Sequence, residues 1–456
     1  MSADNPYVGP RAFRDTETLP NRQREATELT NLLMAERVVL LHAPSGAGKT
    51  SLIQASVLKL LEQEKFRPTK ALRVECPKPT GIQPRNRFSY ALALDLLGRK
   101  KHDPDELAAM TLSQVLCEAL GDSGRRVLIL DQLEETLTLD PAGLDAKEQF
   151  FAELGDALQE CSLWALLAIR EDYLGALDRY LRYLPGELRV RYRLDLLDKQ
   201  DALDAVQKPA QDTGITFTDD AAMVLVDRLA GDTCVEPFQL QVVCRQLWED
   251  WRSAHGEGAT TITVGDARDA DIDSALGKYY DQALDDVEAE FGVPERDLRD
   301  WFEEELTDNG RRRQTTAGPV GGTRVLDRLE DAYLIRSDTR GGTKWYELSH
   351  DRLVAAVLEN NRAWQLQNLD SWQVAAYEWK RRGRQVKFLL PKAKLAYAPP
   401  VNTKGLLRHE QDFLRESFQL AGDLSSAKLH KNQLRILAAI AAIELVVIIV
   451  LLATGA

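Results

Sequence analysis

The chain has 456 residues, a length typical of about three domains. Its content of 44% hydrophobic and 28% charged residues excludes a disordered or collagen-like protein. The net charge of −13 disfavours nucleic acid as a partner, because neutralising phosphates requires clustered lysine and arginine.

Residues 1–30 are polar, and the N-terminus from Met1 to Pro10 lacks the apolar segment of a signal peptide. The five cysteines are scattered, odd in number and form no Cys-x-x-Cys pair, which argues against a disulfide framework or a structural zinc site and favours a reducing cytosol.

Residues 33–200 alternate between short apolar runs and helical patterns, which is typical of a parallel sheet covered by helices on both faces. We therefore predict an α/β domain here. The expected strands are 38–41, 72–76, 127–130, 163–169 and 192–197.

The strongest motif is Ala-Pro-Ser-Gly-Ala-Gly-Lys-Thr-Ser at 43–51, between an expected strand and an expected helix. Glycines let backbone N–H groups turn toward a phosphate, and the helix N-terminus adds positive potential. Lys49 is expected to reach the β- and γ-phosphates, and the Thr50 hydroxyl to ligate Mg²⁺. Ala43 departs from the P-loop pattern, which has glycine there. The expected nucleotide-binding residues are Pro44, Ser45, Gly46, Ala47, Gly48, Lys49, Thr50 and Ser51.

Asp131 directly follows the third expected strand, 127–130, and we predict that it holds Mg²⁺ together with Thr50. Hydrolysis also needs a group that orients the attacking water. Gln132 occupies the next position, so Glu134 or Glu135 is expected to do this if hydrolysis occurs. The alternative for either glutamate is an exposed acid at a helix start, favoured by the helix dipole.

Arg170 follows the expected strand at 163–169, at the edge of the sheet where ligands bind. We predict that it senses the γ-phosphate. A surface ion pair with a neighbouring acid is the alternative.

Residues 200–252 show helical patterns only, and 270–362 combine helices with a β-hairpin pattern, which predicts a winged helix. A winged helix raises the question of DNA binding. The basic clusters at 311–313 and 380–384 are short, however, and are more typical of solvated faces or membrane-proximal contacts; a membrane-surface role for 380–387 is the alternative.

Residues 436–456 form an apolar run of 21 residues with one charge, Glu444. A membrane span needs about 20 residues, and basic residues precede the run, so we predict one span with the bulk of the chain in the cytoplasm. A buried terminal helix is the alternative. A carboxylate near mid-span costs about 2.5–3.5 kcal/mol, which favours assembly of several helices around Glu444; a tolerated, protonated carboxyl is the alternative.

The order and spacing of these motifs resemble the STAND class of signalling P-loop ATPases, which are related to AAA+ proteins. More narrowly, the chain resembles a bacterial branch that is often fused to WD-repeat propellers. The segments that carry the resemblance are 5–13, 21–25, 43–51, 131–135, 170–172, 238–248 and 346–351.

The resemblance implies ATP/ADP and Mg²⁺ as ligands, and further contacts. Arg22 and Glu25 would help to hold the base, although Asn21 replaces the usual glycine. Pro237 would pack near adenine, and His350 would touch the β-phosphate of ADP in the resting state. For His350, a structural role at a helix start is the alternative.

Together these features predict an α/β P-loop NTPase followed by a helical small domain, a winged helix, a helical C-terminal region and one transmembrane helix. The expected boundaries are 1–32 for a nucleotide-proximal segment, 33–200 for the ATPase domain, 201–255 for the small domain, 256–362 for the winged helix, 363–433 for the helical region and 434–456 for the span.

The predicted function is an ATP/ADP-dependent switch with slow hydrolysis that forms a homo-oligomer on activation. It would act at the inner membrane through its span, in bacterial defence, in response to an unidentified trigger or partner protein. The alternatives are a membrane-tethered ATPase that signals to a partner, and a scaffold that binds nucleotide without hydrolysis.

Overall fold

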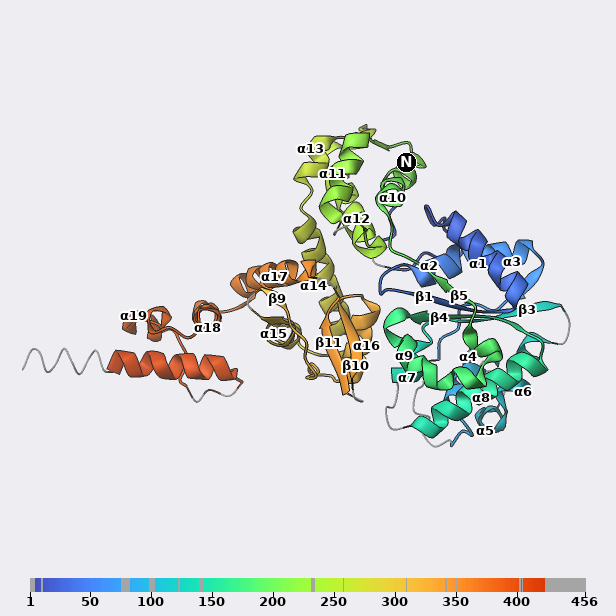
Figure 1. The fold of residues 1–456 in the computed structure, drawn as a ribbon. Helices are drawn as coiled ribbons and strands as arrows, with labels where there is room; N and C mark the ends of the chain where they lie inside the picture. Colours follow the sequence, from blue (N-terminus) through green and yellow to red (C-terminus); the bar gives the residue numbers. More distant parts are fainter. Residues whose placement is uncertain are drawn as a thin grey trace, which may run out of the picture. The chain divides into compact units, whose positions relative to one another are not determined.

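The computed structural model describes residues 5–422, apart from 10, 75–82, 98–102, 122–123, 139–142, 231–233, 257, 309, 341–342, 350, 402 and 404. The chain divides into two compact units, Met1–Leu358 and Glu359–Ala456 (Figure 1). Buried apolar side chains form separate clusters in each unit.

A parallel sheet forms the centre of the N-terminal part. Within the described residues it has five strands in the order β2-β3-β4-β1-β5. Parallel pairing brings the ends of β1, β3 and β4 to one edge, where Ala43 lies opposite Arg170. The strands are β1 (Val38–Ala43), β2 (Phe66–Pro68), β3 (Arg125–Leu130), β4 (Trp164–Arg170) and β5 (Arg191–Arg193).

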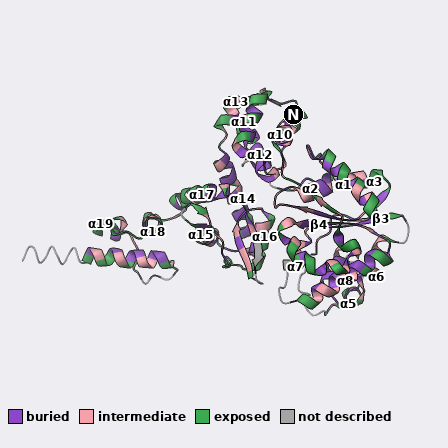
Figure 2. Ribbon diagram, in the orientation of Figure 1, coloured by how far each residue is buried: buried purple, intermediate pink, exposed green. Residues whose placement is uncertain are grey.

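Helices cover both faces of this sheet because its strands are apolar on both sides. Leu41 and Leu166 pack in a core with the helices before and after β1, whereas Leu40 and Leu167 pack in a second core with the later helices. Figure 1 shows α1 and α3 on one side and α4, α6 and α8 on the other, and Figure 2 shows their buried inner faces. The prediction of a parallel sheet flanked by helices is confirmed.

The helices of this domain are α1 (Gln23–Glu36), α2 (Lys49–Leu52), which continues through a π-helical turn into α3 (Leu58–Gln63), α4 (Arg87–Leu97), α5 (Pro104–Ala109), α6 (Leu112–Leu120), α7 (Glu134–Thr138), α8 (Leu144–Glu160) and α9 (Leu174–Leu177).

The edge strand differs from the prediction at 72–76. β2 ends at Pro68, the Thr69 N–H still donates to the Val127 carbonyl at 2.9 Å, and Leu72 forms an isolated bridge to Leu130. Between these points the Thr69 hydroxyl accepts a hydrogen bond from the Ile129 N–H, at 3.0 Å, so a side chain replaces part of the backbone pairing. Residues 75 and 76 lie outside the described residues.

Helices dominate the rest of the first unit, and a β-hairpin precedes the last of them, which begins in this unit and continues past Leu358 into the second. The elements are α10 (Lys199–Gln211), β6 (Thr216–Phe217), α11 (Asp219–Leu229), α12 (Pro237–His255), β7 (Thr261–Ile262), α13 (Val264–Asp269), α14 (Ile272–Phe291), α15 (Glu295–Glu305), β8 (Thr307–Asp308), β9 (Arg311–Arg312), α16 (Thr323–Asp331), β10 (Ile335–Arg340), β11 (Thr343–Leu348) and α17 (Arg352–Asn368).

We call residues 295–348 the hairpin module. Its helices and the antiparallel pair β10–β11 follow the order expected from the sequence. The winged-helix identification and the domain boundaries stay predictions. The second unit contains α18 (Ser371–Arg381), α19 (Lys392–Leu395) and a helical segment at 408–422.

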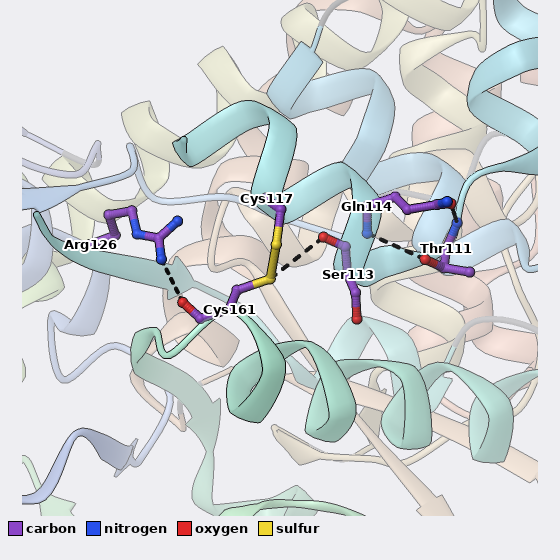
Figure 3. Close-up of a disulfide and its surroundings, with 6 residues drawn as sticks. All are labelled: Thr111, Ser113, Gln114, Cys117, Arg126 and Cys161. Carbon is purple, nitrogen blue, oxygen red and sulfur yellow. Dashed lines mark hydrogen bonds between the residues drawn. A yellow bond between two sulfur atoms is a disulfide. The ribbon is translucent and has the colours of Figure 1, made fainter. Parts of the chain in front are cut away.

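One disulfide, between Cys117 and Cys161, joins α6 to the end of α8 in the described part of the chain (Figure 3). The expectation of no disulfide is therefore wrong. The two cysteines are 44 residues apart in the sequence, but α6 packs against α8 and brings their Cα atoms to 6.1 Å, a normal disulfide separation. An argument from cysteine count and local spacing does not detect a pair made by helix packing.

No described helix, up to residue 422, is both long enough and apolar enough to cross a bilayer. The predicted span at 434–456 and its Glu444 lie outside the described residues. The assignment of the chain to the inner membrane is corrected, because it depended on the apolar run at 436–456 and the basic residues before it, and no described helix supports it.

Candidate nucleotide-binding site

The loop between β1 and α2 has the backbone that phosphate binding requires. Gly46 and Gly48 have φ of +77° and +93°, in the left-handed region where a side chain is strained. Ala43 is the last residue of β1 and is not among the residues with positive φ, so a Cβ is tolerated there. The departure from the P-loop pattern is thus confined to a position that does not need glycine.

Thr50 and Asp131 meet at the sheet edge, as the sequence predicts for a magnesium pair. The Thr50 hydroxyl donates to Asp131 Oδ2 at 2.6 Å, and both residues are buried. Mg²⁺ prefers oxygen ligands and is usually held by one or two protein groups together with substrate phosphates. The hydroxyl and the carboxylate fit such an ion.

Lys49 and Glu134 lie near this pair in a cavity of about 520 Å³. Burial lowers the pKa of Lys49, while Glu134 and Asp131 act in the opposite direction. Burial raises the pKa of Glu134, against the effect of Lys49. Glu134 Oε2 accepts a hydrogen bond from the Arg170 backbone N–H at 3.2 Å. Glu134 and Glu135 both line the cavity, so each is placed to act near a bound phosphate.

Arg170 lies at the end of β4 and also lines this cavity. Its guanidinium contacts Asp172 at 2.9 Å and Glu330 of α16 at 3.5 Å, and lies over the Tyr173 ring. The observed contacts of Arg170 are therefore those of the alternative in which it forms an ion pair with a neighbouring acid. One partner, Glu330, comes from a helix about 160 residues further along the chain.

A second, smaller pocket adjoins the P-loop and is mostly apolar. It is lined by Arg22, Ser51, Pro237 and Tyr333, among others. The Arg22 guanidinium contacts Glu25 at 2.9 Å and the Asp195 carbonyl at 2.6 Å, so it is fixed from two sides. A mostly apolar pocket beside a phosphate loop suits a nucleotide base.

Asn21 has φ of +57°, which explains how it replaces glycine before Arg22. Asparagine enters the left-handed region more readily than other residues with a Cβ. Its side chain also donates to the Asp201 carbonyl and accepts from Lys208, which holds the turn in place.

His350, predicted to contact ADP, lies outside the described residues. Sequence reasoning missed several residues of the hairpin module. Glu330 and Lys344 line the phosphate cavity, and Tyr333 lines both the cavity and the base pocket. Arg73, next to Leu72, lies 3.8 Å from Asp331. In the sequence these residues belong to ordinary charged or hairpin patterns, and only the tertiary fold brings them to the site.

The chain has weak structural similarity to three solved proteins. The Walker-type ATPase PABY2304 of Pyrococcus abyssi is 14% identical, with 76% of this chain and 98% of that chain covered, at a TM-score of 0.43. The ORC2 protein of Aeropyrum pernix, in ADPNP–ADP complexes, is 15% identical, with coverage of 76% and 96%, at 0.41. Cdc6p of Pyrobaculum aerophilum is 15% identical, with coverage of 76% and 95%, at 0.36. These similarities are weak.

No curated protein matches the chain. A family does match, and over most of the length. Residues 6–387 fit the sequence profile of Novel STAND NTPase 1, a range that includes the P-loop, Asp131, Arg170 and the hairpin module. The chain belongs to the Novel STAND NTPase 1 family and is a P-loop NTPase.

Proposed function

We propose that the chain is an ATP/ADP-dependent molecular switch that hydrolyses ATP slowly and self-associates in its ATP-bound form. One observation carries the proposal: the phosphate cavity has walls from both the P-loop domain and the hairpin module. A ligand in that cavity touches both, so its phosphates are able to bias how the two pack together.

The contacts between these two parts are polar and lie beside the cavity. Arg170 contacts Glu330, Arg73 contacts Asp331, and the Tyr173 hydroxyl donates to the Ser337 carbonyl at 3.1 Å. Polar contacts of this kind exchange partners at lower cost than an apolar core does. This supports a hairpin module that is released from the P-loop domain when the nucleotide changes.

In the proposed cycle, the backbone of the P-loop and Lys49 hold the β- and γ-phosphates. Thr50 and Asp131 hold Mg²⁺, which neutralises phosphate charge. Glu134 or Glu135 orients the attacking water. ADP favours the closed packing, and ATP favours release of the hairpin module and formation of a homo-oligomer. An unidentified trigger or partner protein would promote the exchange.

The test measures nucleotide binding by calorimetry and molar mass by light scattering, for the full chain with ADP or with Mg²⁺ and ATPγS. Because the trigger is unidentified, the variant Arg73→Met is used in its place. This change removes the contact to Asp331 and so weakens the link between the P-loop domain and the hairpin module. We expect binding of both nucleotides, and a higher mass for Arg73→Met with ATPγS than with ADP. Lys49→Met is the control and should bind neither. Saturated binding of ATPγS by Arg73→Met without a change in mass would contradict the switch.

A further inference from the structure

Glu330, near the end of α16, is a mostly buried carboxylate on the wall of the phosphate cavity. Its side chain is 18% exposed and contacts Arg170 Nη1 at 3.5 Å, Lys344 Nζ at 2.8 Å and the Ser337 hydroxyl at 2.7 Å. Arg170 belongs to the P-loop domain, whereas Lys344 and Ser337 belong to the hairpin module. Glu330 therefore joins the two parts at the site.

The cations that Glu330 contacts are the ones a third phosphate would need. Arg170 and Lys344 both line the cavity that begins at Lys49. A guanidinium binds carboxylate and phosphate through the same N–H donors. While Glu330 holds Arg170, a γ-phosphate has to compete for it.

The charge near Glu330 adds to this competition. Asp327 and Asp331 of the same helix also line the cavity, so a γ-phosphate entering the closed site meets a group of carboxylates. Like charges at close range repel, and solvent weakens this repulsion at Asp327 and Asp331, whose side chains are 56% and 51% exposed. A diphosphate brings less negative charge and is disfavoured less.

We propose that Glu330 makes the closed nucleotide site selective for a nucleoside diphosphate, because it occupies Arg170 and so acts as a substitute for the γ-phosphate. This inference rests on the proposed function and adds to it the residue that distinguishes ADP from ATP. Glu330 acts through Arg170 and is therefore a positioning residue.

Asp172 is a natural control, because it is the other carboxylate on Arg170. It follows β4 in the same domain as Arg170 and is 44% exposed, compared with 13% for Arg170. Exposed ion pairs contribute little. Removing the charge of Asp172 weakens one contact of Arg170 without changing the link to the hairpin module.

The experiment compares dissociation constants for ADP and for ATPγS with Mg²⁺ in the full chain. Glu330→Gln keeps the size of the side chain and removes its charge. We expect about tenfold tighter binding of ATPγS, with ADP within twofold of wild type. Asp172→Asn should leave the ratio of the two dissociation constants within twofold of the wild-type ratio. Glu330→Asp, which keeps the charge, should give an intermediate ratio and provides the test if Glu330→Gln does not fold.

A general structural role for Glu330 would move both constants together, and that result would overturn the inference. So would an unchanged ratio in Glu330→Gln. In the Arg170→Met background the Glu330→Gln change should alter the ratio much less than in wild type, and an undiminished gain would show that Glu330 does not act through Arg170. Failure of wild type to bind nucleotide would instead count against the proposed function itself.

Discussion

At the scale of single residues, the backbone of the phosphate loop decides which positions tolerate a side chain. Gly46 and Gly48 are left-handed, whereas Ala43 ends a strand. The departure from the P-loop pattern at Ala43 therefore has a local structural explanation. The loop requires glycine at 46 and 48 but not at 43.

Replacing Gly48 by alanine should weaken ADP binding by about tenfold, since a left-handed residue with a Cβ costs roughly 1–2 kcal/mol. The matched change Ala43→Gly should leave affinity within twofold. Calorimetric titration of ADP into both variants checks this. Equal losses in the two variants would show that the backbone conformation is not what sets the pattern.

Glu134 is the stronger candidate for the group that orients water, because the Arg170 N–H fixes its carboxylate beside the cavity. Glu134→Gln should reduce kcat by at least about 100-fold, with ADP affinity retained. Glu135→Gln is the comparison and should retain most activity. Loss of hydrolysis in Glu135→Gln, with Glu134→Gln active, would assign the role to Glu135 instead.

The raised pKa of Glu134 predicts how the rate of hydrolysis changes at low pH. Burial raises its pKa above the usual 4.5, and only the ionised carboxylate accepts a proton. As the pH is lowered, the kcat of wild type should therefore begin to fall at a pH higher than the pKa of an ordinary glutamate. A steady-state profile of kcat from pH 4 to 8 measures this; a rate that is flat down to pH 4.5 would contradict it.

At the scale of elements, packing creates features that local pattern does not contain. The continuous apolar runs of β1 and β4 predict a doubly covered sheet, because successive side chains point to opposite faces and both faces are therefore apolar. The edge strand was misplaced because its regular ladder ends at Pro68, and just beyond it the Thr69 hydroxyl takes the place of a backbone acceptor for the Ile129 N–H. The Cys117–Cys161 disulfide likewise depends on the packing of α6 against α8.

The disulfide should stabilise the P-loop domain, since it closes a loop of 44 residues. A bridge of this kind typically contributes about 2–4 kcal/mol. Dithiothreitol should therefore lower the free energy of unfolding of wild type in urea, measured by circular dichroism. The double variant Cys117→Ser, Cys161→Ser should be insensitive to the reductant. A wild-type unfolding midpoint unchanged by dithiothreitol would contradict the expectation.

At the scale of the whole molecule, the site divides into a part that sequence predicts and a part that it does not. The P-loop, Asp131, Glu134 and Arg170 are identifiable because each lies within a few residues of a strand end. Glu330 is not, because its role depends on a contact between residues about 160 positions apart. In the sequence it is one of several acids on a helix.

The central claim is that the hairpin module responds to the third phosphate. Hydrogen exchange of the full chain, followed by mass spectrometry on peptides from α16 and β11, tests it most directly, because amide exchange reports local opening. We predict faster exchange in these peptides with Mg²⁺ and ATPγS than with ADP, and no difference in Lys49→Met. Equal exchange in both nucleotide states of wild type, with binding saturated, would contradict the account.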